Sequence, residues 1–209
     1  MSIPETEQAV REAKIRTILQ EELQDGEDLA NEARKMIGYL LLEKKGYAAE
    51  DIRKGLAFEV QLGAESAWSS ADFLVSLSGS MAMIIKCAAG SLDSRERQAV
   101  AAARVITSPP LSIAVVADPL HAEVLDVATG KVIGEGFGAI PTKEQLQAIV
   151  TEKPMTPLDP KRLEKEKRIL LAFDAIKCCV PQGADGKGVN LPPDAPESCS
   201  KPGQTGNNL

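Results

Sequence analysis

The sequence predicts an α/β fold, with a mixed sheet of about four to six strands flanked by helices. Apolar, β-branched runs bounded by turn residues recur at 71–77, 81–87 and 112–118, as is typical of buried strands. Stretches with helical spacing of apolar residues lie before, between and after these runs. A chain of 209 residues with 44% apolar residues can bury the core that such a fold needs.

Two helices are predicted before the first strand. The first, Thr6–Leu23, is charged with one apolar side, and Asp25-Gly26 ends it. The second, Asp28–Lys45, has a broad apolar stripe, and Gly46 is a suitable left-handed stop. The two helices either form an antiparallel pair, or the first is a separate arm against a partner subunit.

The segment Ile52–Leu62 contains the first predicted strand, because apolar and polar residues alternate along LAFEVQL. A small, polar loop is predicted for Gly63–Ser70. Two strands then follow, with a hairpin turn at Ser78-Gly79-Ser80 between them. In the next helix, Asp93 is the predicted N-cap, with Glu96 completing a capping box.

The second half of the chain adds a buried strand at 112–118 and a hairpin at 122–135 that turns at Thr129-Gly130. Thr142 can cap a short helix. Asp159-Pro160 starts the last helix, in which Glu164 and Arg168 can pair. This helix either folds back on the domain or dimerises.

The predicted organisation is an N-terminal helical arm at 1–26, a main domain at 27–153, and a linker with a C-terminal helix at 154–179. A tail follows at 180–209. The tail is rich in Gly, Pro, Ser and Asn, so it offers little burial to offset about 1–2 kcal/mol of ordering entropy per residue, and disorder is predicted.

Composition excludes several classes of protein. A net charge of −6 argues against a strongly basic, non-specific nucleic-acid binder, although it allows a local basic site. No apolar run approaches the roughly 18–20 residues that span a bilayer, and no signal peptide is predicted. The four cysteines show no C-x-x-C spacing. We therefore expect a cytoplasmic protein with reduced thiols and no contact with membranes.

The strand–turn–strand–loop–helix segment from Ser70 to Ile106 resembles the core of the PD-(D/E)xK nuclease superfamily. It is most similar to the N-terminal domain of type I restriction enzyme R subunits, and the resemblance extends over about 28–149. It implies a restriction-endonuclease-like sheet. In that family one strand carries an Asp and the next carries Glu-x-Lys. Asp72 matches the first position, but Lys86-Cys87-Ala88 stands where the family has Glu-x-Lys.

The resemblance implies a site in which two carboxylates hold Mg²⁺ and the lysine positions the attacking water. In one interpretation, Asp72 and Lys86 form an ion pair in a site that no longer cleaves. In the other, the site has migrated: Lys86 is the catalytic lysine, and Glu59, Glu65 or Glu43 replaces the lost carboxylate. No cofactor is expected in the first case, and Mg²⁺, with Asp72 as a ligand, in the second.

Basic residues near the implied site are candidates for contacts with nucleic acid. They lie on the central helix and on the segments before the first strand, although several acidic residues are interspersed. The candidates are Arg95, Arg97, Arg104, Lys45, Arg53 and Lys54.

The function predicted from the sequence is a catalytically impaired relative of the R-subunit nuclease domain, retained for binding nucleic acid or protein. One alternative is an active Mg²⁺-dependent DNA endonuclease with a migrated site. A second is a scaffold that oligomerises, or binds a protein partner, through its terminal helices.

Overall fold

The computed structural model of this chain describes residues 29–89 and 92–178. The predicted helix at 6–23, with the arm at 1–26, and the predicted disordered tail at 180–209 lie outside the described residues. None of the described helices is long and apolar enough to cross a membrane.

A mixed six-stranded sheet forms the centre of the fold, which confirms the predicted class, and its strands follow one another in chain order. Every neighbouring pair is antiparallel except β3–β4, which is parallel because α2 carries the chain back across the sheet. The strands are β1 (Ile52–Leu62), β2 (Glu65–Leu77), β3 (Ser80–Cys87), β4 (Ile113–Ala117), β5 (Ala122–Asp126) and β6 (Lys131–Glu135).

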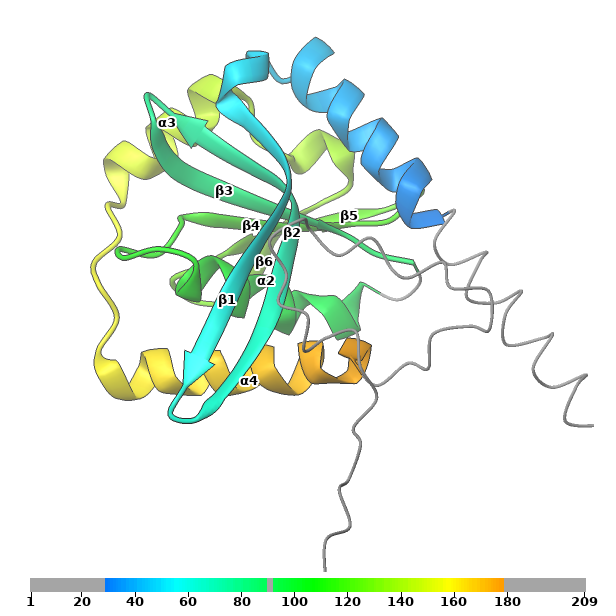
Figure 1. Cartoon of the computed structure of the whole chain (residues 1–209). Coiled ribbons are helices and arrows are strands. Elements are labelled where there is room, and N and C mark those ends of the chain that lie inside the picture. Colours follow the sequence, from blue (N-terminus) through cyan, green and yellow to red (C-terminus); the bar gives the residue numbers. More distant parts are fainter. Residues whose placement is uncertain (1–28, 90–91, 179–209) are drawn as a thin grey trace, which may run out of the picture.

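Helices cover both faces of the sheet (Figure 1). The helix of residues 29–43 and α3 (Lys143–Glu152) pack on one face, where Ile37, Leu41 and Leu146 are fully buried. On the other face lie α2 (Asp93–Val105) and α4 (Pro160–Cys178). Short 3-10 turns, η1 (Ala49–Asp51) and η2 (Phe137–Ala139), precede β1 and follow β6.

Strand β2 pairs with β1 along most of its length but with β3 only in its second half. Its second half pairs with β3, from Leu77↔Ser80 back to Phe73↔Ile85, whereas its first half continues with β1 as a long hairpin. Figure 1 shows this hairpin extending past the other strands. At the level of Asp72, Gly55 of β1 has a φ of +62°, which a residue with a side chain rarely adopts. We call this point, where β2 parts from β3, the fork.

The predicted loop at Gly63–Ser70 is wrong, because β2 begins at Glu65 and pairs with β1 from Leu62↔Glu65 onward. Its small, polar residues have weak strand propensity, and the pairing with β1 overrides it. The predicted cap of α2 is also displaced. The helix begins at Asp93 with Leu92 as its N-cap residue.

Most other local predictions are confirmed. Thr142 caps α3 in a capping box with Gln145. The Asp159 carboxylate accepts from the backbone N–H groups of Lys161 and Arg162 at the start of α4. Of the two alternatives for α4, the structure has the helix folded back on the domain, where Leu170 and Leu171 join the core beside α2.

Candidate functional site

Asp72, the residue that matches the nuclease motif, lies at the fork with both carboxylate oxygens engaged. Oδ1 accepts from Arg34 Nε at 2.6 Å, and Oδ2 accepts from the backbone N–H of Cys87 at 2.7 Å. The Arg34 and Asp72 side chains are 42% and 17% exposed. Arg34 of the helix 29–43 is therefore a cation that pairs with Asp72, and the sequence did not single it out.

Lys86, at the position of the family's second carboxylate, is buried near the end of β3. Its Nζ donates to the backbone carbonyl of Ser70 at 2.6 Å. The bond reaches the first half of β2, beyond the last backbone pair between β2 and β3. We define the fork site as Arg34, Ser70, Asp72, Lys86 and Cys87.

At the fork site, two side chains link β2 to β3 beyond the point where backbone pairing between these strands ends. The Asp72 carboxylate takes a backbone N–H of β3, and the Lys86 ammonium takes a backbone carbonyl of β2. Backbone groups near a sheet must find partners, and these two bonds supply them. Burial raises the pKa of the Cys87 thiol, and the negative charge of Asp72 raises it further.

The carboxylates considered as replacements lie away from Asp72. On β1, Gly55 lies opposite Asp72, and Glu59 lies four residues farther along the strand, opposite Trp68. The backbone of Glu59 is therefore about 13 Å along the strand from the level of Asp72. Glu43 follows Arg34 by nine residues on the same helix, or about 13 Å of helix axis. Both side chains are exposed, as is that of Glu65 at the start of β2. The structure does not bring these three carboxylates to Asp72.

One acidic residue that the sequence did not single out shares a row of the sheet with Lys86. The register pairs Lys86 with Val116 and Val116 with Glu123, so the three lie side by side on β3, β4 and β5. The position of Glu123 between the apolar residues Ala122 and Val124 in a short strand was the available signal. Its position relative to Lys86 depends on the strand order, which a single sequence does not supply.

The predicted nucleic-acid contacts fall into two groups. Arg104 and Lys45 are buried, and Lys45 Nζ donates to the carbonyl of Gly138 at 2.9 Å. Burial lowers the pKa of Lys45. As a contact with phosphate, Arg104 is wrong, since its guanidinium is enclosed by protein. The Lys45 ammonium is engaged by the Gly138 carbonyl. Arg53 and Lys54 are exposed on β1, Arg97 is half exposed, and Arg95 is partly buried.

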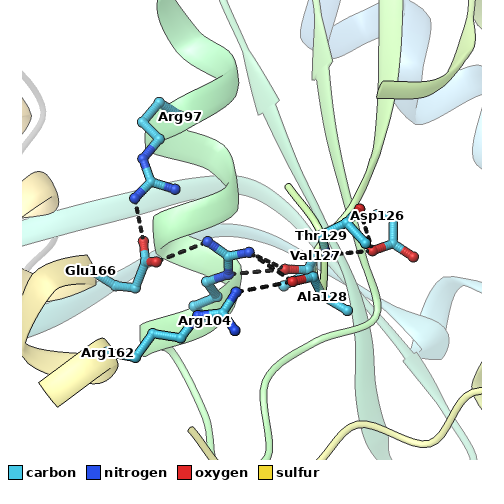
Figure 2. Close-up of polar contacts among 8 residues, drawn as sticks. All are labelled: Arg97, Arg104, Asp126, Val127, Ala128, Thr129, Arg162 and Glu166. Atoms are coloured by element: carbon cyan, nitrogen blue, oxygen red, sulfur yellow. Dashed lines mark hydrogen bonds and ion pairs between the residues drawn. The ribbon is translucent and has the colours of Figure 1, made fainter. Parts of the chain in front are cut away.

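Arg104 belongs to a buried group of charges between α2, α4 and the β5–β6 turn (Figure 2). Its Nη1 donates to Glu166 at 2.8 Å, while Nε and Nη2 donate to the Val127 carbonyl at 2.9 and 2.6 Å. Burial lowers the pKa of Arg104, and Glu166 opposes that shift. The Arg104 and Glu166 side chains are only 4% and 3% exposed.

Two further arginines complete this group. Arg97 lies 3.4 Å from the second oxygen of Glu166, and Arg162 donates to the Ala128 carbonyl at 3.0 Å. We call Arg97, Arg104, Arg162 and Glu166 the arginine cluster. Gly130 lies beside it in the β5–β6 turn with a φ of +74°, which a residue with a side chain rarely adopts. Glu166 gave one signal in the sequence: it lies four residues before the core residue Leu170, on the inner side of α4.

Comparison with known families gives one match. The family model described as "Type I restriction enzyme R protein N terminus (HSDR_N)" matches residues 30–141, which is more than half of the chain. The match runs from the helix 29–43 through β6 and η2, and thus includes the fork site. No curated protein and no solved structure matches the chain.

Proposed function

We propose that this chain, which belongs to the type I restriction enzyme R protein N-terminal family, is a nuclease-related module that binds nucleic acid without cleaving it. The observation that carries the proposal is the state of the fork site: both Asp72 oxygens are bonded within the protein, and a buried lysine stands at the second carboxylate position.

The residues of the fork site do not fit Mg²⁺. This ion needs oxygen ligands in near-octahedral geometry, and usually one or two carboxylates provide them. Asp72 is the only carboxylate of the fork site, and it faces the Arg34 guanidinium and a backbone N–H. A metal ion at this carboxylate would have to displace a cation and leave the Cys87 amide unsatisfied.

The charge of Lys86 adds to this misfit. Replacing the family's Glu by Lys changes the local charge by two units, and each unit pair at about 4 Å interacts by about 4 kcal/mol at an effective dielectric near 20. The third motif position is Ala88, which provides no ammonium to position a water molecule. The arrangement supports a scaffold whose motif positions now hold strands together.

The binding half of the proposal rests on family membership and on exposed cations. Type I restriction enzymes act on DNA, and positively charged surfaces meet its phosphate backbone. Candidate cations that stay exposed or partly exposed in the described structure are Arg53, Lys54, Arg95 and Arg97.

Cleavage is tested with the full chain on supercoiled plasmid and on single-stranded DNA, with Mg²⁺ or Mn²⁺. We expect no cleavage by the wild type, and the same result for Asp72→Asn. Metal-dependent cleavage by the wild type that is lost in Asp72→Asn would overturn the proposal, because it would place a working metal site at the fork.

A gain-of-function variant sharpens this test. Lys86→Glu together with Ala88→Lys restores the family's Glu-x-Lys spacing. We expect Mn²⁺ to raise the melting temperature of this variant and to leave the wild type unchanged, with circular dichroism confirming that the variant folds. Equal stabilisation of both proteins by Mn²⁺ would show that the wild type already holds the ion.

Binding is measured by fluorescence anisotropy with labelled single- and double-stranded oligonucleotides over a series of salt concentrations. We expect an affinity that falls steeply with salt, since neutralised phosphates release counterions. Binding whose affinity does not depend on salt, or the absence of binding, would contradict a nucleic-acid function.

A further inference from the structure

The first half of α4 is the most basic stretch of this acidic chain. Residues 161–168 contain five cations and two carboxylates, in a protein with a net charge of −6. The cations are Lys161, Arg162, Lys165, Lys167 and Arg168. This stretch lies outside the segment that matches the restriction-enzyme family, and the sequence analysis did not select it.

The helix separates its charges onto two sides. Glu166, Leu170 and Asp174 follow one another at four-residue spacing and are all buried against the domain. Lys161, Lys165 and Arg168 have the i, i+4, i+7 spacing that places side chains on one side of a helix, and all three are exposed. The outer side of α4 therefore presents a row of cations to solvent. We call these three residues the α4 basic row.

Glu166, the carboxylate on the buried side of α4, does not neutralise the α4 basic row. Glu166 is enclosed with Arg104 at 2.8 Å and Arg97 at 3.4 Å, so two arginines already balance it. The outer carboxylate, Glu164, pairs with Arg168 at 2.6 Å. Within residues 29–89 and 92–178, Lys161 and Lys165 make no ion pair.

Helix stability explains neither Lys161 nor Lys165. The N-terminus of a helix carries a partial positive charge, so a cation in the first turn is unfavourable by about 0.3–1 kcal/mol. Lys161 lies in the first turn of α4, where the Asp159 carboxylate precedes the helix and the turn itself contains no acidic residue. Arg162 lies in the same turn but bonds to the Ala128 carbonyl. A cation at a helix N-terminus opposes the helix dipole, and such unfavourable placements are expected where function requires them.

We propose that the α4 basic row contacts the phosphate backbone of the nucleic acid that this module binds. The inference rests on the function proposed above and adds the place of contact. Within residues 161–174, whose side chains the structure describes, the outer side of α4 carries no large exposed apolar side chain: Ala172 follows the row, and Leu170 and Leu171 are buried. An anionic membrane is therefore the weaker fit, because interfacial helices bury an apolar face in the lipid.

The test is Lys161→Gln/Lys165→Gln in the full chain, measured by anisotropy with labelled duplex DNA at several salt concentrations. Neither lysine makes an ion pair within the described residues, so folding should be unaffected. The matched control is Lys35→Gln/Lys44→Gln, which removes two exposed cations on and just after the helix 29–43, on the opposite face of the sheet.

We expect the α4 variant to weaken binding and to reduce the slope of log affinity against log salt by about one for each lysine. The control should keep the wild-type slope. If both variants bind like the wild type, or lose affinity equally, the α4 basic row is not the contact, while the proposed function stands. If the wild type binds anionic vesicles and not DNA, both the row's assignment and the proposed function fail.

Discussion

The fork site and the arginine cluster are both built from arginine–carboxylate pairs, yet they differ in exposure. At the fork, Arg34 and Asp72 are 42% and 17% exposed, so water can solvate either group when its partner is lost. In the cluster, Arg104 and Glu166 are 4% and 3% exposed, and each depends on the other. The difference indicates that the motif position tolerates chemical change, whereas the pair that attaches α4 does not.

The largest effect should come from Arg104→Ala. This change leaves Glu166 buried with only the longer contact to Arg97 and leaves the Val127 carbonyl without its donors. We expect the free energy of unfolding to fall by about 3–5 kcal/mol, the usual effect of breaking a buried pair. Urea denaturation followed by circular dichroism measures it.

The control for this prediction is Arg104→Met/Glu166→Leu. Removing both charges leaves no buried ion without a partner, so the double variant should be more stable than the single one. A loss below about 1 kcal/mol in Arg104→Ala, as in exposed pairs, would mean that burial does not distinguish the two sites.

Asp72→Ala should have a smaller effect, about 1–3 kcal/mol. The variant leaves the Cys87 N–H unsatisfied, while Arg34 can turn to solvent. Asp72→Asn keeps an oxygen for that N–H and should cost less. The same urea titration checks both variants. If Asp72→Ala reduced the free energy of unfolding as much as Arg104→Ala, the fork site would stabilise the fold more than its exposure suggests.

A third ion pair, outside the motif, has nearly the same exposure as the Arg34–Asp72 pair and can be compared with it. Lys143 and Asp51 lie 2.6 Å apart with side chains 40% and 13% exposed, close to the values for Arg34 and Asp72. The hydrogen bond from Lys143 lowers the pKa of Asp51, and the bond from the Ala48 N–H lowers it further. Asp51 therefore stabilises the folded state above its ordinary pKa, and that stability is lost as pH falls through the lowered value.

We expect Asp51→Asn to flatten this acid limb of the curve of unfolding free energy against pH, from about pH 5 downward. Its cost near neutral pH should be similar to that of Asp72→Asn, because the two pairs have similar exposure. An acid limb unchanged by Asp51→Asn would contradict the assignment of the lowered pKa to this contact.

The smallest effect should come from Arg168→Gln. The Glu164–Arg168 pair is exposed and spans one helical turn, so its loss should reduce the unfolding free energy by about 0.3–0.5 kcal/mol. The difference from wild type should shrink at high salt, which screens exposed charges. A salt-independent loss would mean that Arg168 stabilises α4 through packing.

The element order and most boundaries could be predicted because their signals are local. Thr142 with Gln145 and Asp159 with Pro160 specify helix starts within a few residues of chain. The start of β2 was missed for the opposite reason. The small residues at 63–70 form a strand only because β1 lies alongside, and no local signal reports that partner.

By itself, the sequence determined the family and the order of the strands and helices, because turn chemistry and apolar spacing act between near neighbours in the chain. Only the tertiary structure decided which charges meet. Asp72 pairs with Arg34, 38 residues away, and Arg104 with Glu166, 62 residues away. Long charged side chains have many partners within reach in an unfolded chain, and it is the packing of helices on the sheet that selects one.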